Sequence, residues 1–95
     1  MEAITRELAR LGCTITDVKA LPGSIVVGYA GRDVICFLTQ RTKDMQKFAD
    51  KWKGVPPVNL TKIEHVHELL ERILAGEFDA DSKYLREQII LRLRK

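Results

Sequence analysis

The sequence predicts a mixed α/β fold of the α+β kind, in which helices flank a mixed four-stranded sheet. Apolar residues recur at helical spacing in several segments, and three short apolar runs separated by turns follow one another in the first half. A fourth run follows the second helical segment. The expected order is α-β-β-β-α-β-α with a further C-terminal helix. The chain has 95 residues, of which 45% are hydrophobic and 31% are charged. This length and composition predict one domain over 1–95, with a core at 1–76 and an extension at 77–95.

The N-terminal segment predicts an amphipathic helix. Ile4, Leu8 and Leu11 are spaced at i, i+4 and i+7, and Gly12 is a stop signal. Two strands are expected next, in 13–20 and 24–30, on either side of a Leu-Pro-Gly turn. The segment "DVICFLT" is a third strand, whose unbroken apolar run predicts a central position with both faces covered. Short connections make these three strands an antiparallel meander.

The second half alternates between helix and strand. Met45, Phe48 and Trp52 predict the core face of a helix that begins near residue 42 and ends before the proline pair at 56–57. The segment "VNL" is a short fourth strand, which a crossover connection allows to lie parallel to the third.

The sequence Thr61-Lys62-Ile63-Glu64 has the pattern of a capping box, which predicts a helix start there. The following helix is expected to end at Gly76, and its inward residues are Ile63, Val66, Leu70, Ile73 and Leu74. Residues 82–95 suit a helix or a strand, and the preceding "DADS", rich in N-cap residues, favours the helix.

Composition points to a cytoplasmic protein without a membrane partner. The charged N-terminal segment lacks the apolar centre of a signal peptide, and no run approaches the length of a membrane span. Cys13 and Cys36 lie in apolar runs without metal-binding spacing, so we expect both to be buried. His65 and His67 are two residues apart and point in different directions on a helix, which disfavours a metal pair.

Charge is distributed unevenly along the chain. Residues 41–53 hold five basic and two acidic side chains, residues 54–81 hold two and six, and residues 82–95 hold five and one. Two basic zones therefore flank an acidic one, which suggests a partner that carries phosphates. A solvated lysine face has the same composition.

A resemblance to a known family rests on "PGSIVVGYAGRDVICFLT" and "KFADKWKG". With the element order, these segments resemble small phage and mobile-element members of the PD-(D/E)XK nuclease superfamily, of the VRR-NUC and Holliday-junction-resolvase type. The resemblance covers residues 1 to about 75 and lies in the scaffold positions Pro22, Gly28, Tyr29, Gly31, Arg32, Trp52 and Gly54.

The catalytic residues of that family are missing. The resemblance places the metal-binding Asp at Ser24, the Glu at Phe37 and the Lys at Thr39. Such enzymes need carboxylates that converge on Mg²⁺, which a serine and a phenylalanine do not supply. The chain is therefore expected to be a pseudo-nuclease without a cofactor or metal.

Three functions from different classes remain. The first is a non-catalytic protein that binds nucleic acid or a nucleoprotein complex, with inhibition of a host system as one form. Its basic residues are Arg41, Lys43, Lys47, Lys51, Arg92 and Arg94. The second is a Mg²⁺-dependent endonuclease with relocated ligands at Glu7 and Asp17. The third is an oligomerising structural module whose C-terminal segment forms a homodimer contact.

Overall fold

The computed structural model describes three stretches of the chain and several single residues. The stretches are 2–18, 23–38 and 58–79, and the single residues are Lys43, Gln46, Lys47, Asp50, Glu87, Gln88 and Leu91. Most of the helices predicted for 42–53 and 82–95 lies outside this part of the chain. The seven single residues are all helical, in agreement with those predictions.

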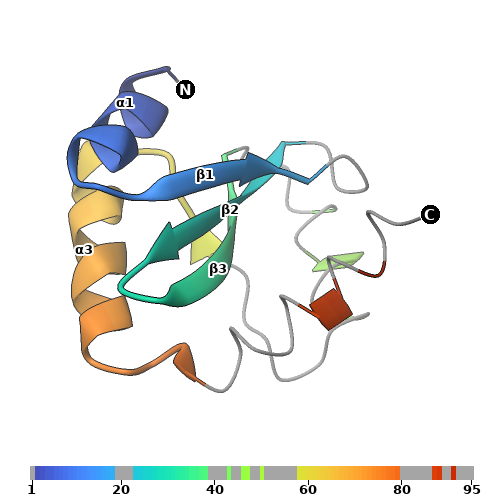
Figure 1. The fold of residues 1–95 in the computed structure, drawn as a ribbon. Coiled ribbons are helices and arrows are strands. Elements are labelled where there is room, and N and C mark those ends of the chain that lie inside the picture. The colour runs from blue at the N-terminus through green and yellow to red at the C-terminus, as the bar shows by residue number, and fades with distance from the viewer. Residues whose placement is uncertain are drawn as a thin grey trace.

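The sheet has four strands in the order β1-β2-β3-β4, of which Figure 1 labels the first three. Strands β1 (Thr14–Asp17), β2 (Ser24–Tyr29) and β3 (Arg32–Phe37) pair antiparallel, and β4 (Val58–Asn59) pairs parallel with β3. The connection from β3 to β4 is long enough for the crossover that a parallel pair requires. The predicted meander and mixed sheet are confirmed.

Strand β3 is the buried centre of the sheet. Its last four residues, Val34 to Phe37, are each at most 2% exposed. Side chains alternate between the faces of a strand, so four consecutive buried positions require that both faces are covered. Val34 and Cys36 join the core beneath the helices, whereas Ile35 and Phe37 lie on the opposite face.

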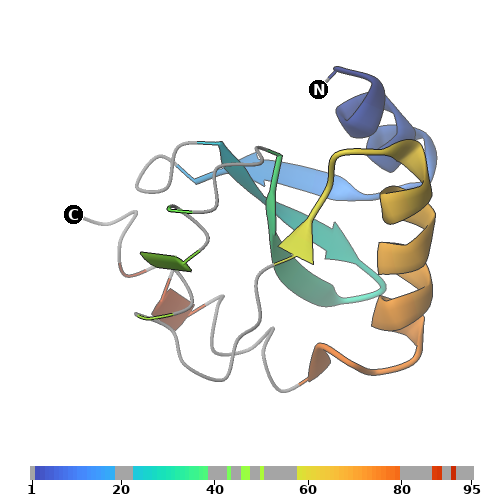
Figure 2. The same ribbon diagram turned by 180° about the vertical axis from the view of Figure 1, so that it is seen from behind.

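Two helices pack on one face of this sheet (Figures 1 and 2). They are α1 (Glu2–Arg10) and α3 (Ile63–Leu74), which also contact each other. Their buried residues follow the i, i+3, i+4, i+7 pattern of one helix face. The shared core contains Ile4 and Leu8 of α1, Val66, Leu69, Leu70 and Ile73 of α3, and Ile25, Val27, Val34, Cys36 and Val58 of the sheet.

Helix α3 buries fewer apolar residues than its sequence predicts. Ile63 is 36% exposed and Leu74 is 66% exposed, so their predicted core positions are wrong. Successive helical residues are turned by about 100°, and Leu74 therefore points away from the side on which Ile73 packs. Ile63 lies in the first turn, at the margin of the core.

The start of α3 also differs from the prediction. The helix begins at Ile63, with Lys62 as its N-cap, and Thr61 and Glu64 do not form the expected capping box. The side chain of His65 takes that role, because its Nδ1 accepts hydrogen bonds from the backbone N–H groups of Thr61 (3.1 Å) and Lys62 (3.2 Å). Gly76, with φ +84°, follows the helix as predicted.

Both cysteines are buried free thiols, as expected. Burial raises the pKa of the Cys36 thiol. Within the part of the chain that the structure describes, no helix is both long and apolar enough to cross a lipid bilayer.

A two-residue turn joins β2 to β3. Tyr29 pairs with Arg32, and the two residues between them both have positive φ, 51° at Ala30 and 78° at Gly31. This is the backbone of a type I′ turn, whose twist suits an antiparallel hairpin. Glycine adopts it freely, but the Cβ of Ala30 is crowded there.

We expect Ala30→Asn to stabilise the protein by about 0.5–1 kcal/mol, because asparagine tolerates positive φ better than alanine does. The carbonyl of residue 30, which accepts a 2.9 Å hydrogen bond from Arg32, is unchanged in this variant. Urea unfolding measures the difference. Gly31→Ala is the matched control and is expected to destabilise by about 1 kcal/mol. A lower unfolding free energy for Ala30→Asn would contradict the assignment of the turn.

Candidate functional site

Two of the three positions at which the resemblance places catalytic residues lie side by side. Ser24 of β2 and Phe37 of β3 are direct partners in the antiparallel register. Leu38, the next residue, donates its backbone N–H to the carbonyl of Gly23 at 2.8 Å, so the hairpin is still paired beyond them. Thr39 lies outside the described residues. The sheet thus brings together two of the three positions that the resemblance singles out.

The chemistry at this pair is that of a packed core. Phe37 is 1% exposed and is among the largest fully buried side chains, and Ser24 is 5% exposed. A carboxylate at either position would lose its hydration, which is costly unless a metal or another cation compensates. The pair contributes packing to the sheet and no charged oxygen.

The predicted basic helix is described at two of its lysines. Lys43 and Lys47 are both helical and exposed, and residues four apart on a helix lie on the same side. Neither lysine has an ion pair within the described part of the chain. Arg41, Lys51, Arg92 and Arg94 lie outside the described residues.

Asp50, which lies near the two lysines in sequence, forms a hydrogen bond with a neutral side chain. The amide of Gln46 donates a 2.9 Å hydrogen bond to the Asp50 carboxylate, one helical turn further along. This exposed contact lies beside the two lysines in sequence, and it uses the carboxylate without a lysine. Lys43 and Lys47 themselves are both exposed.

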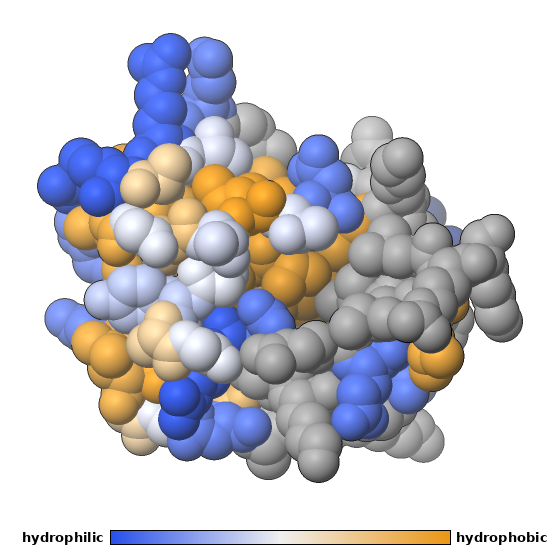
Figure 3. All heavy atoms as spheres, viewed as in Figure 1, coloured by the Kyte–Doolittle hydropathy of each residue, from blue (hydrophilic) through white to orange (hydrophobic). Residues whose placement is uncertain are grey.

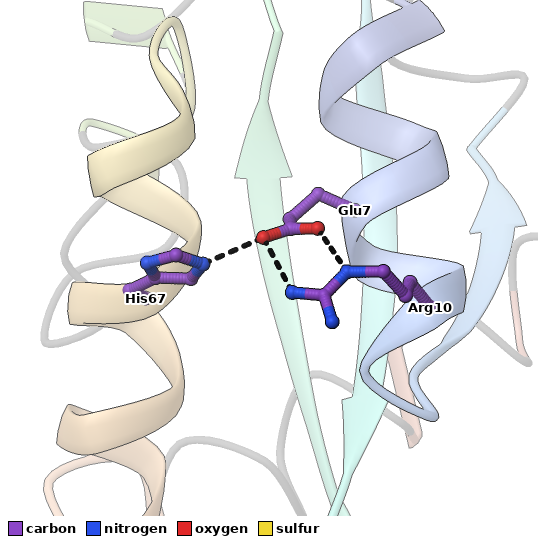
Figure 4. Close-up of polar contacts among 3 residues, drawn as sticks. All are labelled: Glu7, Arg10 and His67. Atoms are coloured by element: carbon purple, nitrogen blue, oxygen red, sulfur yellow. Dashed lines mark hydrogen bonds and ion pairs between the residues drawn. The ribbon is translucent and has the colours of Figure 1, made fainter.

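A second polar cluster joins the two packed helices (Figure 4). Arg10 donates to Glu7 through Nε, 2.6 Å from Oε1, and through Nη2, 2.9 Å from Oε2. On α3, Nε2 of His67 lies 2.7 Å from Oε2 of Glu7. The Glu7 side chain is only 15% exposed, although those of Arg10 and His67 are more than half exposed.

These partners change the acidity of Glu7. The hydrogen bond from Arg10 contributes most, the one with His67 adds to it, and together they lower the pKa of Glu7 from 4.5 to about 2, against the opposing effect of burial. The carboxylate is held in its charged form, with both oxygens in short contacts. It links α1 to α3 across 60 positions of sequence.

Glu7 and Asp17, the metal ligands of the alternative endonuclease prediction, have different surroundings in the structure. Glu7 points toward Arg10 and His67, as Figure 4 shows, whereas Asp17 is exposed at the last residue of β1. Among the described residues, no three metal-ligating side chains form a group. A metal site at Glu7 and Asp17 stays a prediction, and the contacts of Glu7 are those of a structural carboxylate.

A second pair over a long sequence separation links the β2–β3 hairpin to the residues that follow α3. Nε of Arg32 lies 2.6 Å from Oδ1 of Asp79, which follows α3. The guanidinium lowers the pKa of Asp79. Neither this pair nor the contact of Glu7 with His67 was predicted from the sequence, because no spacing rule relates charges 47 or 60 residues apart.

A cleft of about 270 Å³ lies at the same hairpin. Thr14, Gly28 and Asp33 form a row across three strands within it. A Cβ at Gly28 would collide with the hydroxyl of Thr14 and lie 3.1 Å from Oδ1 of Asp33. The glycine therefore makes room for neighbouring side chains of this chain, which explains it without a ligand.

Substitutions of Phe37 test whether this end of β3 is part of the packed core. We expect Phe37→Ala to lower the unfolding free energy by about 3–5 kcal/mol, because it removes a fully buried ring. Phe37→Glu, which places a carboxylate at this buried position, is expected to cost more. Denaturant unfolding with circular dichroism measures both. A Phe37→Glu protein as stable as the wild type would show that this position tolerates charge and is not core.

The Glu7 cluster gives a pH-dependent contribution to stability. Its folded pKa of about 2 lies below the ordinary 4.5, so the contribution is complete above pH 4.5 and is lost as the pH falls toward 2. We expect Glu7→Gln to lower the melting temperature near neutral pH, with a difference from wild type that shrinks across this interval. Thermal unfolding at a series of pH values measures it. Glu68→Gln, on the exposed side of α3, is the control. A difference that is constant with pH would exclude this role for Glu7.

Comparison with known proteins does not identify a relative. No family model, curated protein or solved structure matches this chain. The resemblance of its scaffold residues to the PD-(D/E)XK superfamily stays a prediction. The candidate site is therefore defined by its own geometry, which consists of exposed helical lysines on one element and a packed, uncharged strand end on another.

Proposed function

We propose that the chain is a non-catalytic protein that binds nucleic acid, alone or within a nucleoprotein complex, through the basic face of the helix that the sequence predicts for 42–53. The observation that carries the proposal is the pair Lys43 and Lys47, which are helical, exposed and without an ion pair among the described residues. An inhibitor of a host system, from a phage or other mobile element, is one form of such a protein.

Exposed lysines on a helix suit the phosphate backbone. Residues four apart are separated by about 6 Å along the helix axis, so successive turns meet successive charges of an extended polyanion. Flexible ammonium groups contact phosphates without reading bases, which gives binding that tolerates sequence and depends on salt. The five basic and two acidic side chains of residues 41–53 extend this pattern, and Asp50 is already engaged by Gln46.

The buried strand end supports binding over catalysis. Ser24 and Phe37 occupy the positions that the resemblance assigns to metal ligands, and both are buried against the rest of the domain. An aromatic ring in this place stabilises the sheet, whereas hydrolysis of a phosphodiester by that family's chemistry would need carboxylates there. Phosphate contacts on the helix need no residue from this strand end.

Of the other two functions, one has an observation in its favour. Leu91, in the C-terminal segment, is helical and 54% exposed, which suits an oligomerising module that uses this segment. The Mg²⁺-dependent endonuclease with ligands at Glu7 and Asp17 has no comparable support, because Glu7 is held by Arg10 and His67.

The basic face is tested by charge reversal. We expect Lys43→Glu/Lys47→Glu to weaken binding to duplex DNA or RNA at every sequence tried. The slope of log affinity against log salt concentration should fall by about 2, because two phosphate contacts are lost. Fluorescence anisotropy titrations at several salt concentrations measure both quantities.

Lys62→Glu is the matched control, because it makes the same charge change on an exposed residue at the start of α3. The affinity and salt slope of this single variant are compared with those of Lys43→Glu and of Lys47→Glu. Equal affinities and slopes for Lys43→Glu, Lys47→Glu and wild type would contradict the proposal. DNA cleavage with Mg²⁺ that disappears in Asp17→Ala would favour the endonuclease instead.

A further inference from the structure

Strand β1 is an edge of the sheet. It pairs with β2 on one side, and no strand among the described residues pairs with it on the other (Figure 1). Three of its four residues, Thr14, Thr16 and Asp17, are exposed. An edge strand presents backbone N–H and C=O groups to solvent and accepts another strand readily.

The hydrogen-bond pattern shows which groups point outward. Val18 donates its N–H to the carbonyl of Ser24 at 3.4 Å, so Val18 and every second residue before it face β2. The backbone groups of Ile15 and Asp17 therefore point away from the sheet. They have no hydrogen-bond partner among the described residues. Cys13, the next residue on this outer side, already donates its N–H to Leu8 of α1 at 3.0 Å.

We propose that two copies of the chain form a homodimer by antiparallel pairing of their β1 edges, with the two-fold axis at Thr16. Ile15 of one copy then lies opposite Asp17 of the second copy, and the reverse pair is generated by the symmetry. Each pair exchanges two N–H to C=O hydrogen bonds. All four outward groups of Ile15 and Asp17 are satisfied in both copies, and the result is one continuous eight-stranded sheet.

The side chains are compatible with this register. Thr16 meets Thr16 of the second copy at the axis, and threonine pairs across antiparallel strands are favourable. Asp17 lies opposite Ile15 and not opposite a second carboxylate. A register centred on Asp17 would set the two carboxylates against each other, and one centred on Ile15 would need the Cys13 N–H that α1 already uses.

The surface over β1 and β2 is of mixed character. In Figure 3, pale and orange atoms lie in its middle, with blue atoms beside them. A four-residue strand buries less area than a permanent interface needs, so the dimer is reversible and depends on concentration. This dimer does not depend on nucleic-acid binding, and it is distinct from a contact through the C-terminal segment.

Sedimentation velocity over a concentration series up to the millimolar range tests the proposal. The wild type should show a monomer–dimer equilibrium. Thr16→Lys and Thr16→Glu each place like charges opposite one another at the axis, and each should raise the dissociation constant about fivefold. An equimolar mixture of the two variants should form a heterodimer at least as tight as the wild-type dimer, because the charges at the axis are then opposite.

Asp17→Pro is a second, independent variant. It removes an outward N–H from each copy while the hydrogen bonds of β1 with β2 remain, and it should weaken the dimer roughly tenfold. Glu68→Gln, on α3, changes the net charge by as much as Thr16→Lys and should leave the dimer unchanged. Circular dichroism checks that each variant is folded.

Two results would overturn the proposal. One is a wild-type protein that stays monomeric through the whole concentration series. The other is a dimer that tolerates Thr16→Lys, Thr16→Glu and Asp17→Pro but dissociates in Leu91→Ser, which would place the contact in the C-terminal segment.

Discussion

The fold depends on the burial of β3 on both of its faces. Four consecutive residues of this strand, Val34 to Phe37, are almost inaccessible to solvent. A strand in this position needs a neighbour on each side and a covering layer on each face, since its backbone groups and its side chains are all removed from water. The antiparallel β2, the parallel β4 and the packing of α1 and α3 on one face follow from that requirement.

The same constraint limits what the strand can do chemically. Ser24 and Phe37 face each other at a paired, buried end of the sheet, where ionised groups would lose hydration without compensation. Exposed charge is found elsewhere, on helical lysines that have no ion pair within the described ranges. This division between a neutral strand end and a charged helix is why we propose binding to phosphates instead of their hydrolysis.

Two side-chain contacts over long sequence separations link the elements at the surface. Glu7 joins α1 to His67 of α3, and Arg32 of the β2–β3 hairpin joins Asp79 beyond α3. Exposed ion pairs contribute little individually, but the Glu7 carboxylate is mostly shielded and is held by two partners, which explains its low pKa. The open edge of β1 is the opposite case, because its outward backbone groups have no partner among the described residues.

Local patterns in the sequence determined the order of elements, the central position of β3, the burial of both cysteines and the helical lysines, because each depends on the spacing of neighbouring residues. The inward face and cap of α3 were only partly predictable. Ile63 and Leu74 match the apolar pattern, but the direction of the sheet beneath the helix decides which residues it buries. Tertiary structure alone decided three features: the partners of Glu7 and Arg32, the pairing of Ser24 with Phe37, and the open edge at β1. Each of them depends on how distant segments are brought together.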